Sequence, residues 1–226
     1  MTVTTTGLTR ATGIAAAVAG TIFITVQIGH PGFDTYLSQT NEWVIRCSAK
    51  AVMTVLALAG ITGMFLRYHR RFGVLGLAGY LLLTVGYLAL FAVECIVAYV
   101  LPTVAHSNPA YVEDVLDAAV GGSPSGDIGH MQQLFLVTGI GYSLGGLLFG
   151  IALFRAGVLA RWAALLLAYG TTSALALSVL PESFNRPFAV PTGVALIGLG
   201  VSLWRDQRSE TVAAPVTAWI AEPATR

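Results

Sequence analysis

One carboxylate, Glu94, stands inside the otherwise apolar run LFAVECIVAYV. A charge in a membrane helix is costly, so such a residue is a candidate site and needs a partner. Arg46 and Lys50 are the candidate partners, because they lie four residues apart on one face of a helix and near the same predicted depth. Glu94 would then either form an ion pair that fixes helix packing or act as a proton donor with His130 or His30 as partner.

Further polar side chains occur at the ends of the other apolar runs, on the same predicted side of the membrane. We expect them to form an outward-facing polar cup with apolar walls, which suits a small amphiphilic or lipid-like ligand. Glu94 and His130 are the catalytic candidates, and the ligand-binding candidates are His30, Asp34, Arg46, Lys50, Glu182 and Arg186.

The spacing of these residues does not match a metal or cofactor site. The sequence contains no HxxxH or HExxH motif, and Pro31 breaks the helix between His30 and Asp34. Haem ligation by His30 and His130 would be confined to the mouth of the bundle. Walker loops, GxGxxG fingerprints and nucleophile motifs are also missing from the sequence. The sequence therefore predicts neither a metal nor a cofactor.

The composition is typical of a membrane protein. Of the 226 residues, 55% are hydrophobic and only 10% are charged, whereas soluble domains carry about a quarter charged residues. The net charge of +1 leaves no basic stripe for phosphates, which argues against a nucleic-acid partner. The expected partners are membrane lipid and a small amphiphilic ligand.

Six apolar runs are long enough to cross about 30 Å of hydrocarbon at about 1.5 Å per residue. Their continuity predicts helices, because barrel strands would alternate apolar and polar residues. We therefore expect an all-α polytopic protein with a transmembrane domain over 11–204 and short tails, 1–10 and 205–226. The runs are Ala11–Ile28, Val44–Leu66, Val74–Pro102, Met131–Phe154, Val158–Leu180 and Phe188–Trp204.

Basic residues define the orientation. If the N-terminus is cytoplasmic, nine basic residues lie on that side and only Arg46, Lys50 and Arg186 on the other. The positive-inside rule then places both termini in the cytoplasm of a bacterial cell, with a multi-pass chain in its cytoplasmic membrane. The nine residues are Arg10, Arg67, Arg70, Arg71, Arg155, Arg161, Arg205, Arg208 and Arg226.

The outer segment 103–129 is the only sizeable predicted loop, and it contains a helix signal. Asn108 is placed to cap this helix, Pro109 to begin it and Gly121 to end it. The helix is expected either to cover the cup as a lid or to lie on the membrane as a connector. Asp127 is expected to cap the next span and to place His130 in its first turn. The apolar face consists of Val112, Val115, Leu116 and Ala119.

Gly141, Gly145 and Gly150 recur at spacings that allow close helix approach. We favour packing within the monomer, and the alternative is a homodimer through this face.

Two hairpins have similar sequences, RFGVLGLAGYLLLTVGY and RAGVLARWAALLLAYGT. The similarity indicates either a parallel internal repeat or shared composition. The two cysteines, Cys47 and Cys95, are expected to be buried thiols or, alternatively, one disulfide on the outer side.

The segments QIGHPGFD, GDIGHMQQLFLVTGIGY and LPESFNRPFAVPTG resemble those of uncharacterised actinobacterial six-helix membrane proteins. The resemblance covers most of the chain and implies the architecture, without an activity. Three functional classes therefore stay open: a binding protein that uses the cup, an intramembrane acid/base enzyme of cyclase or isomerase type that uses Glu94, and a small-molecule or proton-coupled transporter.

Overall fold

The computed structural model describes residues 4–173 and 185–218, and within them all regular secondary structure is helical. The all-α prediction is therefore confirmed. The elements are α1 (Thr5–Thr25), a 3-10 turn (Phe33–Thr35), α2 (Thr40–Cys95), a π-helical segment (Ile96–Val100), α3 (Leu101–Ser107), α4 (Pro109–Ala119), α5 (Met131–Ala156), α6 (Arg161–Ser173) and α7 (Asn185–Ala218).

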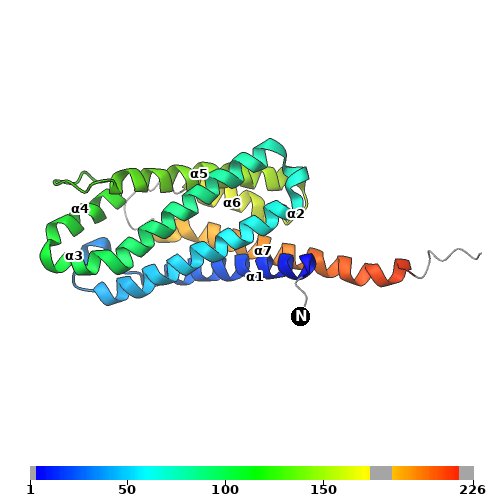
Figure 1. The fold of residues 1–226 in the computed structure, drawn as a ribbon, viewed down its shortest axis with the longest axis horizontal. Helices are drawn as coiled ribbons and strands as arrows, with labels where there is room; N and C mark the ends of the chain where they lie inside the picture. The colour runs from blue at the N-terminus through cyan, green and yellow to red at the C-terminus, as the bar shows by residue number, and fades with distance from the viewer. Residues whose placement is uncertain (1–3, 174–184, 219–226) are drawn as a thin grey trace, which may run out of the picture.

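The long element α2 folds back on itself at Gly73, as Figure 1 shows. The φ of Gly73 is 59° and its ψ is −159°, a conformation that glycine adopts without a steric penalty. The two halves, here called the first limb (40–72) and the second limb (74–95), lie side by side. The rings of Phe65 and Tyr80 stack at 4.3 Å, and the Thr62 and Tyr80 hydroxyls are 3.2 Å apart.

Three helices of the described chain are long and apolar enough to cross a membrane: Thr5–Thr25, Thr40–Ser107 and Met131–Ala156. The second of them includes the fold-back at Gly73, so it comprises both limbs of α2, the π-helical segment and α3. For α6 the structure describes 13 residues.

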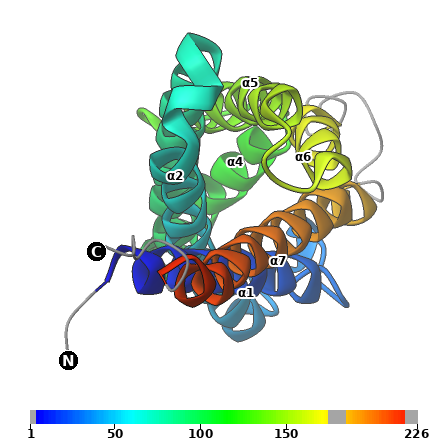
Figure 2. The same ribbon diagram turned by 90° about the vertical axis from the view of Figure 1, so that its right-hand side faces the viewer.

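The helices run along the long axis of the molecule, which gives the bundle two distinct ends (Figure 1). The start of α1, the fold-back of α2, the α5–α6 turn and the last part of α7 lie at one end, here called the arginine end. The 3-10 turn, α3 and α4 lie at the opposite end, here called the α4 end. Figure 2 looks along the bundle from the arginine end and shows α1, α2, α5, α6 and α7 arranged as a ring.

Two left-handed glycines mark the turns of the two similar hairpins. Gly73 in RFGVL has a φ of 59°, and Gly157 in RAGVL has a φ of 62°. Their ψ angles differ, at −159° and 22°. The likeness between the hairpins thus includes the left-handed glycine but not the path of the chain after it.

Glycines allow the helices to approach until their backbones touch. A Cβ at Gly145 would lie 2.3 Å from the Leu83 nitrogen, and one at Gly141 would lie 2.7 Å from the Gly86 Cα. Gly150 faces α6 in the same way, 2.8 Å from the Ala164 oxygen. All three glycines of the predicted face are therefore occupied by helices of the same chain. This agrees with packing within the monomer, whereas a homodimer through this face stays a prediction.

The first and last helices also meet through glycines, which the sequence analysis did not anticipate. A Cβ at Gly20 would lie 2.3 Å from the Gly193 oxygen, and one at Gly13 would lie 2.8 Å from the Gly200 oxygen. These contacts join α1 to α7 along an antiparallel seam.

Several helices extend beyond the predicted spans. α1 begins at Thr5 rather than Ala11, because the Thr4 hydroxyl caps the Gly7 N–H at 3.1 Å. The third span continues through Pro102 to Ser107. α7 continues to Ala218, into the predicted tail 205–226, and the Tyr68 hydroxyl donates to Asp206 at 2.5 Å.

Candidate ligand site at the α4 end

The helix predicted in the outer loop is α4. The Asn108 side chain accepts from the Tyr111 N–H at 3.2 Å, Pro109 is the first residue, and Gly121 follows with a φ of 86°. Its larger apolar side chains are buried in a cluster with residues next to the 3-10 turn, from the start of α2 and from the π-helical segment. α4 therefore covers protein, as a lid would, rather than only a membrane surface. The buried members from α4 are Val112, Val115 and Leu116, and they join Tyr36, Trp43, Cys47, Val97 and Leu101.

Asp114 ties the following loop to α4. Its carboxylate accepts from the N–H of Ser125 at 2.7 Å, from the N–H of Gly126 at 3.0 Å and from the Ser125 hydroxyl. These donors, the Ser125 N–H first, lower the pKa of Asp114 below its usual value. The loop after α4 is therefore anchored at Ser125 and Gly126.

The predicted cap of α5 is wrong. Asp127 accepts from the N–H of Gly129 at 2.8 Å, and Gly129 precedes the first residue of α5, Met131. His130 itself occupies the N-cap position, without a side-chain cap, and it is exposed. Left-handed Gly129 (φ 60°) separates Asp127 from the helix start and moves the carboxylate out of capping range.

Tyr36 connects the 3-10 turn to the π-helical segment. In that segment the Leu101 N–H bonds to the Ile96 carbonyl, five residues earlier. In the same register the Val97 carbonyl would need an N–H from residue 102, which is proline and has none. The Tyr36 hydroxyl donates to this carbonyl at 2.7 Å. Burial, followed by the nearby Cys47, raises the pKa of Tyr36, so its hydroxyl stays protonated as a donor.

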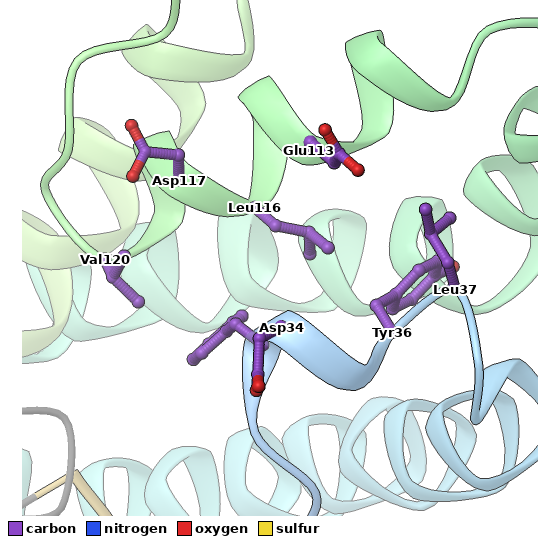
Figure 3. A pocket seen from close by; sticks show the side chains of 8 residues that line it. Asp34, Tyr36, Leu37, Glu113, Leu116, Asp117 and Val120 are labelled. Carbon is purple, nitrogen blue, oxygen red and sulfur yellow. The ribbon is translucent and has the colours of Figure 1, made fainter.

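A cavity of about 460 Å³ lies between α4 and the 3-10 turn, here called the α4 cavity (Figure 3). In Figure 3 the side chains of Leu116 and Val120 point into the space between the two elements, whereas the carboxylates of Asp34, Glu113 and Asp117 lie around its rim and point outward. The cavity thus has an apolar floor and an acidic rim. Its lining residues are Phe33, Asp34, Tyr36, Leu37, Glu113, Leu116, Asp117 and Val120, and none of them is basic.

Of the predicted ligand-binding residues, Asp34 lines this cavity, and two basic candidates have other partners. Arg46 pairs with Glu42 at 2.6 Å and donates to the carbonyls of Val26 and Ile28 at 2.8 and 3.0 Å. It therefore closes the C-terminal end of α1, where the carbonyls lack partners. Lys50 lies 3.6 Å from Glu94.

His30 does not line this cavity, and the structure does not describe the side chains of the two remaining candidates. The His30 ring meets Trp43 edge-on at 4.8 Å, and its Nδ1 is 2.9 Å from the Pro31 oxygen. Glu182 lies outside the described residues, and the Arg186 side chain is not described, although its backbone belongs to the first turn of α7.

Glu94 is buried, with 7% of its surface exposed, and its nearest cation is Lys50. The two residues connect the two limbs of α2. Cys47 and Cys95 form no disulfide in this structure, so the disulfide alternative does not hold there. Glu94 is not among the residues of the α4 cavity, and no interaction in the described chain joins it to His130.

Glu113, Asp117 and Tyr36 line the cavity but were not predicted as site residues. For the two acidic residues a signal was present, because they lie on the polar face of the loop helix, opposite the predicted apolar face. Once the apolar face covers the protein, residues at its edge must line the seam beneath it. No sequence pattern marks Tyr36 as a site residue, because its role depends on a contact with Val97, 61 residues away.

A layer of hydroxyl groups lies in the middle of the bundle. The Tyr142 hydroxyl donates to Thr192 at 3.1 Å. Tyr87 and Ser143 are buried, and within the described part of the chain neither side-chain oxygen has a hydrogen-bond partner. Over residues 4–173 and 185–218, no three potential metal ligands gather in one place.

No family model, curated protein or solved structure matches this chain. The function must therefore be argued from the geometry.

Proposed function

We propose that the chain is a six-span protein of a bacterial cytoplasmic membrane with both termini in the cytoplasm. Three apolar helices and the fold-back at Gly73 support this topology. Large apolar side chains are exposed around the outside of the bundle, where only lipid would shield them from water. They include Ile14, Val52, Leu81, Ile140, Leu165 and Val190.

Within this topology, the α4 cavity binds a small amphiphilic molecule that carries a cationic group. The apolar floor would hold the apolar part, and the rim of Asp34, Glu113 and Asp117 would attract the charge. Phe33 adds an aromatic ring to the lining, and aromatic faces attract alkylammonium groups. The observation that carries this proposal is the combination of three carboxylates with no basic residue in one lining.

An acid/base enzyme has less support. A general acid must come within hydrogen-bond reach of its substrate, directly or through one water. Glu94 is buried beside Lys50 and does not line the cavity. The ion pair is accounted for by the packing of the two limbs, so we prefer binding to catalysis.

Transport remains a second candidate because of one observation. Buried hydroxyl groups without a partner are rare, and among the described residues Tyr87 and Ser143 have none, near one depth of the bundle. A polar solute or water passing through the bundle would satisfy them. Solute-dependent flux in proteoliposomes, lost in a Ser143→Ala/Tyr87→Phe double variant, would favour this candidate over simple binding.

The binding proposal is tested with three probes of equal chain length: hexyltrimethylammonium, hexanol and hexanoate. Calorimetry on the protein in nanodiscs should show saturable binding of the ammonium compound alone. The triple variant Asp34→Asn/Glu113→Gln/Asp117→Asn should lower that affinity by about tenfold, as expected for three exposed charges at about 0.5 kcal/mol each.

Asp127→Asn is the matched control. Asp127 is an exposed carboxylate of the same loop that does not line the cavity, and asparagine can still accept from Gly129. This variant should bind like the wild type. Equal binding of the ammonium compound and hexanol, or an equal loss in Asp127→Asn, would contradict the proposal.

A further inference from the structure

A second hollow lies toward the arginine end, between α1 and the first limb of α2, with a volume of about 500 Å³. Its residues recur at helical spacing on both helices, so they form one groove that follows the two axes. From Leu58 to Arg67 this groove is about 14 Å long at about 1.5 Å per residue. α1 contributes Thr5, Leu8, Thr9 and Thr12, and α2 contributes Leu58, Ala59, Thr62, Gly63, Leu66 and Arg67.

The walls of this groove require no polar partner. The Thr9 hydroxyl donates to the Thr5 carbonyl at 2.9 Å, and the Thr12 hydroxyl donates to the Thr9 carbonyl at 2.8 Å. Thr62 is hydrogen-bonded to Tyr80. Leu8 and Leu66 are 57% and 63% exposed, so both leucines stay uncovered by the protein. An alkyl chain could therefore lie along Thr9, Thr12 and Thr62 without leaving their hydroxyl groups unsatisfied.

One end of the groove is positive. Arg67 is the only charged residue in its described lining. Thr5 is the first residue of α1, so the positive end of the helix dipole lies at the same end. Basic pockets between membrane helices on the cytoplasmic side recognise anionic lipid headgroups.

We propose that this groove binds an anionic phospholipid of the inner leaflet, with one acyl chain between α1 and α2 and its phosphate at Arg67. The groove is separate from the α4 cavity and shares no residue with it. The inference therefore depends on the proposed membrane topology but not on the proposed cationic ligand.

Native mass spectrometry tests the proposal on the full-length protein, with phosphatidylglycerol and phosphatidylcholine of identical acyl chains. The wild type should retain one phosphatidylglycerol in preference to phosphatidylcholine. Arg67→Gln should lower this preference by about threefold to tenfold, because it removes the charge at the phosphate. Arg70→Gln, an exposed arginine one turn away that does not line the groove, should leave the preference unchanged.

Thr5→Glu provides a second variant that should fold normally. A carboxylate in the first turn of a helix is compatible with its dipole, but here it would repel the phosphate. The preference for phosphatidylglycerol should fall again, while the melting temperature stays close to that of the wild type. Equal retention of both lipids by the wild type, or equal losses in Arg67→Gln and Arg70→Gln, would overturn the proposal.

Discussion

Charged residues along one face of the first limb of α2 have separate structural tasks. Glu42 holds Arg46, and Arg46 closes the end of α1. Lys50, one turn further on, meets Glu94 across the fold-back. The four-residue spacing predicted the stripe, and with it the choice of Lys50 or Arg46 as partner of Glu94. Arg46 is held by the α1 carbonyls, which leaves Lys50 for Glu94.

We expect Lys50 and Glu94 to stabilise the protein as a pair. Removing one partner leaves a buried charge, whereas removing both leaves none. We therefore expect a double-mutant cycle with Lys50→Met and Glu94→Gln to be non-additive. The double variant should lose about 1–3 kcal/mol less free energy of unfolding than the two single variants lose together. Denaturant unfolding in detergent measures the cycle. Additive losses would show that the two charges do not interact.

The hydrogen bond of Tyr36 gives a second prediction at this scale. Tyr36→Phe removes the donor to the Val97 carbonyl and leaves that buried oxygen unpaired, which should cost about 1–3 kcal/mol. Tyr99→Phe is the control, because the Tyr99 hydroxyl also forms one hydrogen bond, to Ser48, but the side chain is exposed. Tyr99→Phe should lower the free energy of unfolding by no more than about 0.5 kcal/mol. Thermal unfolding of both variants checks the difference, and equal losses would contradict this role.

At the scale of the elements, glycines determine which helices are neighbours. The second limb of α2 packs on α5 through Gly86, Gly141 and Gly145, and α1 packs on α7 through its own glycine pairs. In lipid, close packing of this kind replaces much of the hydrophobic driving force between helices. The helix pairs that meet through glycines form the wall of the ring seen in Figure 2.

Gly145→Ala should destabilise the bundle by about 1–3 kcal/mol, as expected for overpacking, because its Cβ would lie 2.3 Å from the backbone of Leu83. Gly139→Ala on the same helix is the matched control, since no atom lies within 4 Å of its added Cβ. Alanine is a better helix former than glycine, so this control should be neutral or slightly stabilising. Unfolding measurements on both variants test the close packing of α2 on α5. Equal changes in stability for Gly145→Ala and Gly139→Ala would contradict it.

At the scale of the whole molecule, the charge asymmetry and the two ends of the bundle agree. Gly73 and Gly157 come two residues after Arg71 and Arg155, and both turns lie at the end where α1 begins (Figure 1). α4 and the acidic cavity lie at the opposite end, where the external medium would supply a ligand.

The orientation is testable in intact cells with a membrane-impermeant maleimide, in a Cys47→Ala/Cys95→Ala background. A cysteine in place of the exposed Ser123, beside α4, should react in intact cells. A cysteine in place of the exposed Arg70 should react only after permeabilisation, because the positive-inside rule places it in the cytoplasm. The reverse pattern would invert the proposed topology and move the α4 cavity to the cytoplasm.

Helices, the loop helix α4 and the side of the molecule that carries the arginines were predictable from the sequence alone. Each depends on short-range patterns or on sums over many residues: apolar run length, the Asn108–Pro109 start signal and the placement of arginine. None of these depends on how a helix is rotated about its axis.

Which side chains meet was decided only by the tertiary structure. The predicted cup joined Asp34 to Arg46, Lys50 and Glu94, whereas the folded chain joins Asp34 to Glu113 and Asp117. A side chain's partner depends on the rotation and register of its helix, and these are determined by distant contacts such as Tyr36 with Val97. The π-helical segment before Pro102 shifts that register locally. The residues that line the cavity therefore could not be derived from spacing along the chain.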